Sequence, residues 1–184
     1  MEKLALVDRL KAGEREAQKE LYDRYAGHLM ALCQRYVGDR TVAEDLLHDS
    51  FLRIFHSIQR FEWRGEGSLR GWMDRVAVNL CIEYLRSLRP RGLLQELVAE
   101  EPAEEPTSEW LDQFTAEELF EEVCHLPEGY RTIFNLYYLE GLSHREIADL
   151  MGIRERSSSS QLARARTALA RRLMNKKRNN HDKE

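Results

Sequence analysis

Apolar residues recur every three or four positions through most of residues 1–91, which is the spacing of amphipathic helices. Three helices are predicted first, and Thr41 is expected to cap the third. A glycine-rich loop over residues 61–71 leads into a fourth helix, which Ser68 is expected to cap and whose Trp72 falls at core spacing. No stretch alternates apolar and polar residues as a strand does, so the pattern predicts an all-α fold.

The most informative pattern lies in residues 142–173, which predict a short helix, a glycine turn and a longer helix. Ser143 and Glu146 have the spacing of a capping box, and Gly152 is suited to the left-handed backbone of a tight turn. The longer helix places its apolar residues on one face and carries arginines largely off that face. This combination is typical of a helix-turn-helix that enters the DNA major groove. A structural helical hairpin with no DNA-binding role is the alternative.

Charge divides the chain into parts, although its formal net charge is only −4. Between residues 95 and 122 there are eleven acidic and no basic residues, whereas residues 154–178 hold nine basic residues and one acidic residue. The acidic stretch contains prolines and few apolar residues, so it is predicted to be a linker. We therefore predict a helical domain over residues 1–91, an acidic linker over 92–114, a helix-turn-helix domain over 115–175 and a basic, polar tail over 176–184.

Composition disfavours several classes of function. Cys33, Cys81 and Cys124 are far apart and lack the spacing of a metal site, so each is predicted to be a small buried residue. No phosphate-binding loop or set of catalytic side chains is visible, so we expect neither an enzyme nor a bound cofactor or metal. No apolar run approaches the roughly 20 residues of a membrane-spanning helix, and no signal peptide is recognised. We expect a cytoplasmic protein that does not insert into membranes.

Three motifs that occur in a fixed order carry a resemblance to a known family. They are AEDLLHDSFLRIF at residues 43–55, WRGEGSLRGWMDRVAVNLCIEYLRSLR at residues 63–89 and LPEGYRTIFNLYYLEGLSHREIADLMGIRE at residues 126–155. Together they resemble the small extracytoplasmic-function (ECF) type of sigma factor in the sigma-70 family. The resemblance implies a two-domain subunit that directs bacterial core RNA polymerase to −10 and −35 promoter elements and helps to initiate transcription.

The resemblance also implies a set of partners. They are the polymerase core, through its β′ clamp helices and β flap, promoter DNA, and an anti-sigma factor. An independent helix-turn-helix regulator is one alternative, but it leaves the motifs of the first domain without a role. Another alternative is an adaptor that binds polymerase or an anti-sigma factor without reading promoters.

The third predicted helix has a polar face suited to docking on a protein. Asp45, His48, Asp49 and Leu52 are spaced by three and four residues and therefore share this face. In similar sigma factors this helix binds the β′ clamp helices, so the resemblance assigns core binding to these residues and to Arg53. Spacing alone favours an ordinary solvated face, in which Arg53 pairs with Asp49.

Separation of DNA strands requires aromatic surfaces and hydrogen-bonding groups that hold bases removed from the stack. The resemblance points to the glycine-rich loop and the fourth helix, with Asn79 as the first choice for a base contact. Trp63 and Ser68 are weaker choices, since Trp63 is equally suited to anchoring the loop. The predicted −10 contacts are Trp63, Arg64, Ser68, Arg75, Asn79, Arg86 and Arg89, of which the last two are directed at phosphates.

The second helix of the helix-turn-helix is expected to read the −35 element. Base edges are expected at its start, and arginines further along are expected to meet phosphates. The candidates are Arg154, Glu155, Arg156, Ser157, Ser159, Ser160, Gln161, Arg164 and Arg166. The family usually has a capping serine where this chain has Arg154. The first turn is therefore predicted either to fray or to start later, capped by Ser157 or Ser158.

Overall fold

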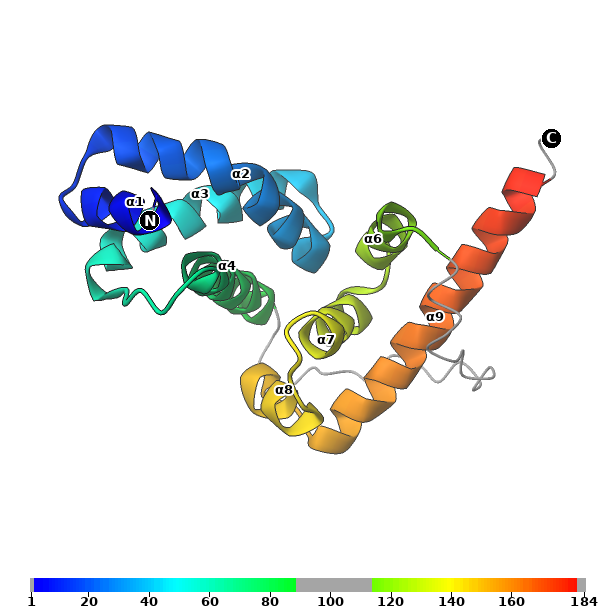
Figure 1. Ribbon diagram of the computed structural model, residues 1–184. Helices are drawn as coiled ribbons and strands as arrows, with labels where there is room; N and C mark the ends of the chain where they lie inside the picture. The colour runs from blue at the N-terminus through cyan, green and yellow to red at the C-terminus, as the bar shows by residue number, and fades with distance from the viewer. Residues whose placement is uncertain (1, 89–113, 182–184) are drawn as a thin grey trace. The chain divides into compact units, whose positions relative to one another are not determined.

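The computed structural model describes residues 2–88 and 114–181, and every regular element in these ranges is a helix (Figure 1). This confirms the predicted all-α fold. The chain divides into two compact units, residues 1–88 and 89–184. The predicted linker lies outside the described residues except for its last position, and Arg89 lies outside them as well.

The first unit is built on three long helices that pack against one another. These are α2 (Arg15–Val37), α3 (Arg40–Ser57) and α4 (Ser68–Ser87), and α1 (Glu2–Lys11) packs against α2 and the 3-10 turn η1 (Ile58–Arg60). Tyr36, Ile54 and Met73 contribute one fully buried side chain from each long helix. Burial of a side chain of this size contributes about 1.5–3 kcal/mol, so this shared core holds the exposed faces of α3 and α4 in place.

Helix α3 begins two residues earlier than the sequence pattern predicts. Asp39 is its N-cap, with an extended backbone at φ −111°, and its carboxylate accepts a hydrogen bond from the Val42 amide at 3.0 Å. Thr41 lies within the first turn, so the cap predicted there is wrong. Gly38 (φ 73°) ends α2, so Asp39 is the first residue after that helix and already stands at the N-cap position of α3.

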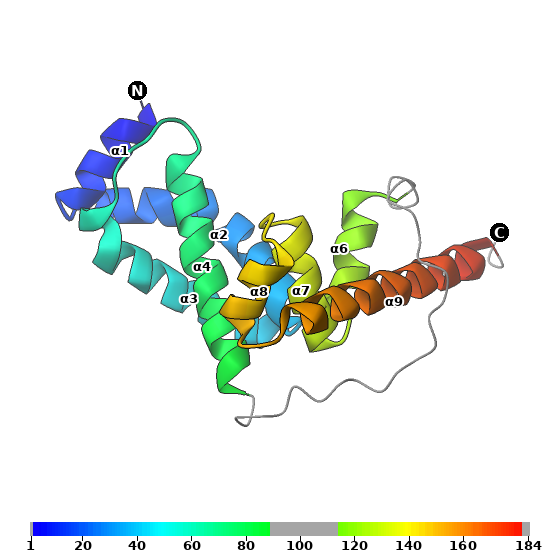
Figure 2. The ribbon, with the colours of Figure 1, turned by 90° about the horizontal axis from the view of Figure 1, so that it is seen from below.

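The second unit is arranged along one long helix, α9 (Glu155–His181). Three shorter helices pack against it: α6 (Ala116–Cys124), α7 (Glu128–Tyr138) and α8 (His144–Met151). Figure 2 shows α9 as the long orange-to-red helix with α7 and α8 at its N-terminal half. The core of this unit combines Ile133, Ile147 and Leu169, all of which are fully or almost fully buried.

The predicted helix-turn-helix is present in α8 and α9. The Ser143 hydroxyl accepts from the Glu146 amide at 3.3 Å, and the Glu146 carboxylate accepts from the Ser143 amide at 2.9 Å, which is the predicted capping box. Gly152 has φ 68° and ends α8 by donating to the Ala148 carbonyl. These contacts are local in sequence, which is why the sequence pattern predicted them.

Helix α9 continues to His181, so the residues assigned to a separate tail from 176 onward begin as helix. Lys176 donates to the Glu121 carboxylate at 2.5 Å and Arg172 donates to the Glu122 carboxylate at 2.8 Å, which fastens this part of α9 to α6. The hydrogen bond raises the pKa of Lys176 and lowers that of Glu121. Helix α9 and its contacts with the acidic α6 therefore continue past the boundary expected from composition.

Candidate functional site

The α3 residues predicted to bind polymerase all lie on the solvent side of that helix. Asp45, His48, Asp49, Leu52 and Arg53 are exposed, and the Leu52 side chain is 66% exposed. The opposite side of α3 is buried in the core. This face therefore presents one large apolar side chain beside two carboxylates, a combination that a protein partner could cover.

The ion-pair partner of Arg53 differs from the alternative that the sequence offered. Its guanidinium lies 3.1 Å from each carboxylate oxygen of Glu83 in α4. Pairing with Asp49 is therefore wrong, and the Asp45 and Asp49 carboxylates both face solvent. Arg53 ties α3 to α4 at the edge of the exposed face.

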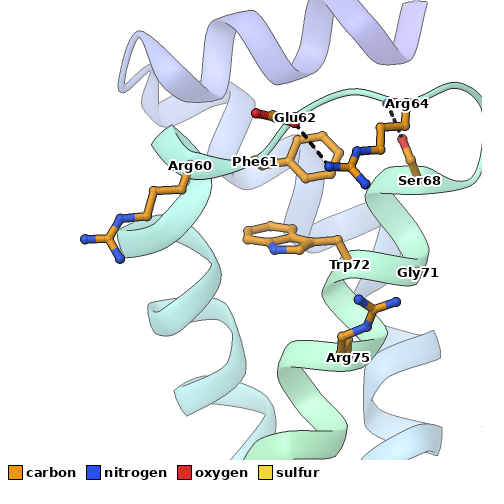
Figure 3. A pocket seen from close by; sticks show the side chains of 8 residues that line it. All are labelled: Arg60, Phe61, Glu62, Arg64, Ser68, Gly71, Trp72 and Arg75. Atoms are coloured by element: carbon orange, nitrogen blue, oxygen red, sulfur yellow. Dashed lines mark hydrogen bonds and ion pairs between the residues drawn. The ribbon is translucent and has the colours of Figure 1, made fainter.

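A pocket of about 540 Å³ lies between η1, the following loop and the start of α4 (Figure 3). The Phe61 and Trp72 rings form its aromatic wall, with centroids 5.1 Å apart and planes tilted by 43°. Its lining residues are Arg60, Phe61, Glu62, Arg64, Ser68, Gly71, Trp72 and Arg75. The pocket thus combines two aromatic surfaces with three arginines, a composition suited to an unstacked base and its phosphates.

The loop that forms the rim of the pocket is held by its own polar contacts. The Ser68 hydroxyl donates to the Gly65 carbonyl at 2.7 Å and accepts from the Arg64 amide at 3.2 Å. Gly67, with φ 84°, occupies the N-cap position, so the prediction that Ser68 caps α4 is wrong. Ser68 is already the first helical residue, and its side chain therefore closes the loop rather than the helix.

The predicted −10 residues divide into those at the pocket and those beyond it. Arg64, Ser68 and Arg75 line the pocket, whereas Trp63 is half-buried in the loop and is not among the lining residues. Asn79 is exposed on α4 one turn beyond Arg75, about 6 Å further along the same face. Arg86 is exposed two turns further on, near the end of α4.

Sequence reasoning missed Trp72 as a pocket residue. Its spacing with Val76 and Leu80 predicted a core position, but the indole is only half-buried and packs directly against Phe61 on one wall of the pocket. Phe61 and Arg60 were missed as well, because they lie at and just before the start of the loop and reach the site only through the fold. An aromatic residue on each side of a glycine-rich loop is the sequence signal that could have found this pair.

The predicted −35 residues lie at the start of α9 and differ in exposure. Arg154, Glu155, Arg156, Ser159 and Ser160 are exposed, and the remaining candidates, Ser157, Gln161, Arg164 and Arg166, are half-buried. The exposed residues form the outer side of the first two turns. This is the part of a recognition helix that meets base edges.

Helix α9 starts at Glu155, without the later start proposed from the serines. The Ser157 and Ser158 amides both donate to the Arg154 carbonyl, at 2.9 and 3.1 Å. The Ser158 side chain is fully buried and bonds to His144, so it does not cap the helix. Arg154 therefore occupies the N-cap position of α9, and its carbonyl accepts the first backbone hydrogen bonds of the helix.

Other kinds of site receive no support in the described ranges. Among residues 2–88 and 114–181, no three His, Cys, Asp or Glu side chains are grouped as metal ligands. Cys33 and Cys81 are buried as predicted, whereas Cys124 is half-buried. A hydrogen bond to Cys33 and burial raise the pKa of Cys81, which keeps that thiol protonated. No helix in the described part of the chain is long and apolar enough to cross a membrane.

Comparison with known proteins places these features in one family. Residues 21–91 match sigma-70 region 2, and residues 116–169 match sigma-70 region 4. The ECF RNA polymerase sigma-E factor of Haemophilus influenzae is 31% identical over 173 residues, covering 88% of this chain and 90% of that protein. The ECF RNA polymerase sigma factor SigW of Bacillus subtilis is 28% identical over 178 residues, covering 91% and 94%.

A similar solved structure is that of the sigma factor RpoE in complex with the anti-sigma factor NepR from Bartonella quintana. It is 20% identical, has a TM-score of 0.46 and covers 85% of this chain and 96% of that chain. Two region matches in the expected order, together with 31% identity over nearly the whole length of a relative, show that this chain belongs to the sigma-70 family as an ECF RNA polymerase sigma factor.

Proposed function

We propose that this sigma factor divides its work among three surfaces. The α3 face binds core RNA polymerase, the pocket at the start of α4 receives a base of the −10 element, and the first turns of α9 read the −35 element. As an ECF sigma factor the protein directs core RNA polymerase to promoters, and it is an initiation factor rather than an enzyme.

The pocket is the single observation that carries this proposal furthest. Stacking of one base on an aromatic side chain contributes about 1–3 kcal/mol, enough to offset part of the cost of removing that base from the duplex. Trp72 supplies the accessible aromatic surface, with the buried Phe61 ring packed against it. Arg75 and Arg64 supply cations at the same pocket, and Arg64 is paired with the Glu62 carboxylate at 3.2 Å. Asn79 adds an exposed amide, which can pair with a base edge, one turn beyond.

Polymerase binding is assigned to α3 because this helix combines exposed carboxylates with an exposed leucine. Charged groups steer the encounter of two proteins, and an apolar side chain between them supplies area that is buried on docking. Asp45 and Asp49 lie one turn apart on this face, and Leu52 follows one turn further along α3. A basic surface on the polymerase clamp, with an apolar centre, would complement this face.

The units have separate roles in this proposal. Residues 1–91 bind polymerase and the −10 element, residues 115–175 bind the −35 element, and residues 92–114 connect them. Tethering makes the second DNA contact effectively intramolecular once the first has formed. We propose that the protein acts in the cytoplasm, where core polymerase and promoters lie, and that an anti-sigma factor would act by covering one of the three surfaces.

The test is selection of promoters from DNA randomised at both elements, using core polymerase with and without this protein. We expect two separated sequence motifs to be enriched only when both proteins are present, and run-off transcripts to begin downstream of them. A palindromic motif enriched by the protein alone would instead indicate an independent helix-turn-helix regulator. Binding to core polymerase with no enriched sequence would indicate an adaptor.

A further inference from the structure

We propose that His144 is a positioning residue for promoter reading, because its hydrogen bond to Ser158 holds the first turn of α9 in place against α8. The inference rests on the −35 role proposed above for α9. His144 is the first residue of α8 and was not a predicted DNA contact. Its ring nitrogen Nδ1 lies 3.0 Å from the Ser158 hydroxyl oxygen.

The buried hydroxyl of Ser158 gives this hydrogen bond its importance. Ser158 has no exposed surface and lies on the side of α9 that also buries Leu162 and Ala165. A buried hydroxyl without a partner is costly, so the hydrogen bond to His144 favours the observed packing of the first turn. The position of the α9 first turn relative to α8 therefore depends on the side chain of His144.

The start of α9 lacks the side-chain cap that stabilises the first turn of many helices. The amides of the first turn are normally satisfied by an acceptor on the N-cap side chain, but the residue before α9 is Arg154, whose guanidinium only donates. The first turn is therefore expected to depend on tertiary contacts more than a capped turn does. The hydrogen bond between His144 and Ser158 is such a contact, one turn into the helix.

His144 is itself held in place from a third helix. Its ring stacks on Tyr137 of α7, with centroids 5.0 Å apart and planes 20° apart. Ser143, the preceding residue, is fixed by the capping box of α8. The imidazole thus has little freedom, and it transmits the positions of α7 and α8 to the beginning of α9.

The residues next to Ser158 are the ones that face DNA in the proposed function. Ser159 follows it directly, and Arg156 lies two residues before it; both are exposed. Because residues three apart lie on the same face of an α-helix, a small rotation of the first turn redirects both side chains together. Loss of the bond between His144 and Ser158 is therefore expected to blur base discrimination rather than to abolish DNA binding.

The test uses the full-length protein in complex with core polymerase and a promoter obtained by the selection described above. For each variant we would measure the ratio of transcription from the selected promoter to transcription from copies with single base-pair changes in the −35 element. This ratio does not depend on how much of the variant is folded. The variants are His144→Ala, His144→Asn, Ser158→Ala and the double variant, with His125→Ala as the matched control in the same unit.

We expect the wild-type ratio to be tenfold or more at the best positions, about the value of one good base contact. His144→Ala and Ser158→Ala should each lower it about fivefold, and the double variant should lower it no further, since both remove one bond. His144→Asn, whose amide oxygen can take the place of Nδ1, should restore much of the ratio. His125→Ala, whose ring bonds to the Glu121 carbonyl one turn earlier in the chain, should leave it unchanged.

The inference is overturned if His144→Ala keeps the wild-type ratio while the wild type discriminates, and the proposed function then stands. It is equally overturned if the two single variants lower the ratio additively, because independent effects would then be at work. A wild type that transcribes with no dependence on the −35 sequence would overturn the proposed role of α9 together with this inference. Where His144→Ala fails to fold, His144→Asn and Ser158→Ala decide the same question.

Discussion

Asn79 is an exposed residue on a helix whose other side is buried in the core, so its amide can contact DNA. Its neighbours Val78 and Leu80 are buried, whereas Asn79 itself is exposed, because successive residues of α4 point in different directions. Arg75 lies one turn earlier on the same face, at the pocket. Such residues are not part of the core. Replacing them is therefore expected to change contact with DNA while leaving the free energy of unfolding nearly unchanged.

Replacement of Asn79 by alanine tests the proposed base contact. We expect Asn79→Ala to impair promoter opening about tenfold, the value of one good hydrogen-bonded base contact, and to leave core binding unchanged. Opening would be followed by permanganate reactivity of unpaired thymines, and core binding by co-elution. Equal loss of both activities would show that Asn79 has no specific part in opening.

Trp72 and Trp63 make a matched pair for the pocket itself. Trp72→Ala removes one aromatic wall, so we expect promoter opening to fall by about tenfold or more, in line with the stacking of a single base. Trp63→Ala, at a half-buried position outside the pocket lining, should have a much smaller effect.

The same permanganate assay applies to both tryptophan variants, with thermal unfolding of each as the check on folding. Similar losses in the two variants at equal stability would contradict the pocket assignment. Trp72→Phe, which keeps a smaller ring, should fall between the wild type and Trp72→Ala.

At the scale of elements, the capping box and turn of α8 were predictable from sequence, whereas the N-caps of α3 and α4 and the contacts across the fold were not. The α8 capping box and Gly152 depend on residues a few positions apart, so the spacing identified both. Phe61 and Trp72 come together only when η1 packs beside α4, and no helical period reports that. The same holds for Ser158, whose partner lies fourteen residues away in α8. The site was thus predicted in outline, and its aromatic wall was not.

The capping box of α8 gives a stability prediction with a defined pH dependence. The Ser143 hydroxyl, followed by its amide, lowers the pKa of Glu146 from its usual value of 4.5. A carboxyl group with a lowered pKa in the folded state adds stability above its unfolded pKa and loses it as pH falls through the folded value. We expect Ser143→Ala to cost about 1 kcal/mol near pH 7, as for loss of an N-cap, and progressively less as pH falls below 4.5.

Hydrogen exchange of α8 amides between pH 3 and pH 7, corrected for intrinsic rates, would measure this cost. Ser87→Ala is a suitable control, because its hydroxyl donates to the Tyr84 carbonyl at the other end of a helix and forms no capping box. A cost for Ser143→Ala that is the same at every pH would show that Glu146 takes no part.

Helix α9 gives a second prediction at this scale. Arg164 is half-buried beyond the exposed first turns, so we expect its contact with DNA to be to phosphate rather than to a base. Arg164→Ala should reduce the slope of log affinity against log salt by about one and leave the preferred −35 sequence unchanged. Titration of labelled promoter DNA at several salt concentrations measures the slope, and an unchanged slope would remove Arg164 from the interface.

At the scale of the whole molecule, the chain joins two units that are each folded around their own core. Each unit carries a different part of the proposed promoter contact, and residues of the first also carry the polymerase contact. Sequence motifs predicted this division because each unit matches one sigma region in order. Binding to core polymerase is the central requirement, since without it neither DNA surface acts in initiation.

The most direct measurement is co-elution of the purified protein with core RNA polymerase in the absence of DNA. We expect a stable complex that is lost in Asp45→Arg/Asp49→Arg, which reverses two charges on the exposed α3 face. Glu16→Arg/Asp23→Arg, a matched reversal at two exposed positions of α2, should still bind. Binding that survives the α3 reversal, or that is lost equally in both double variants, would contradict the assignment of α3 as the polymerase-binding face.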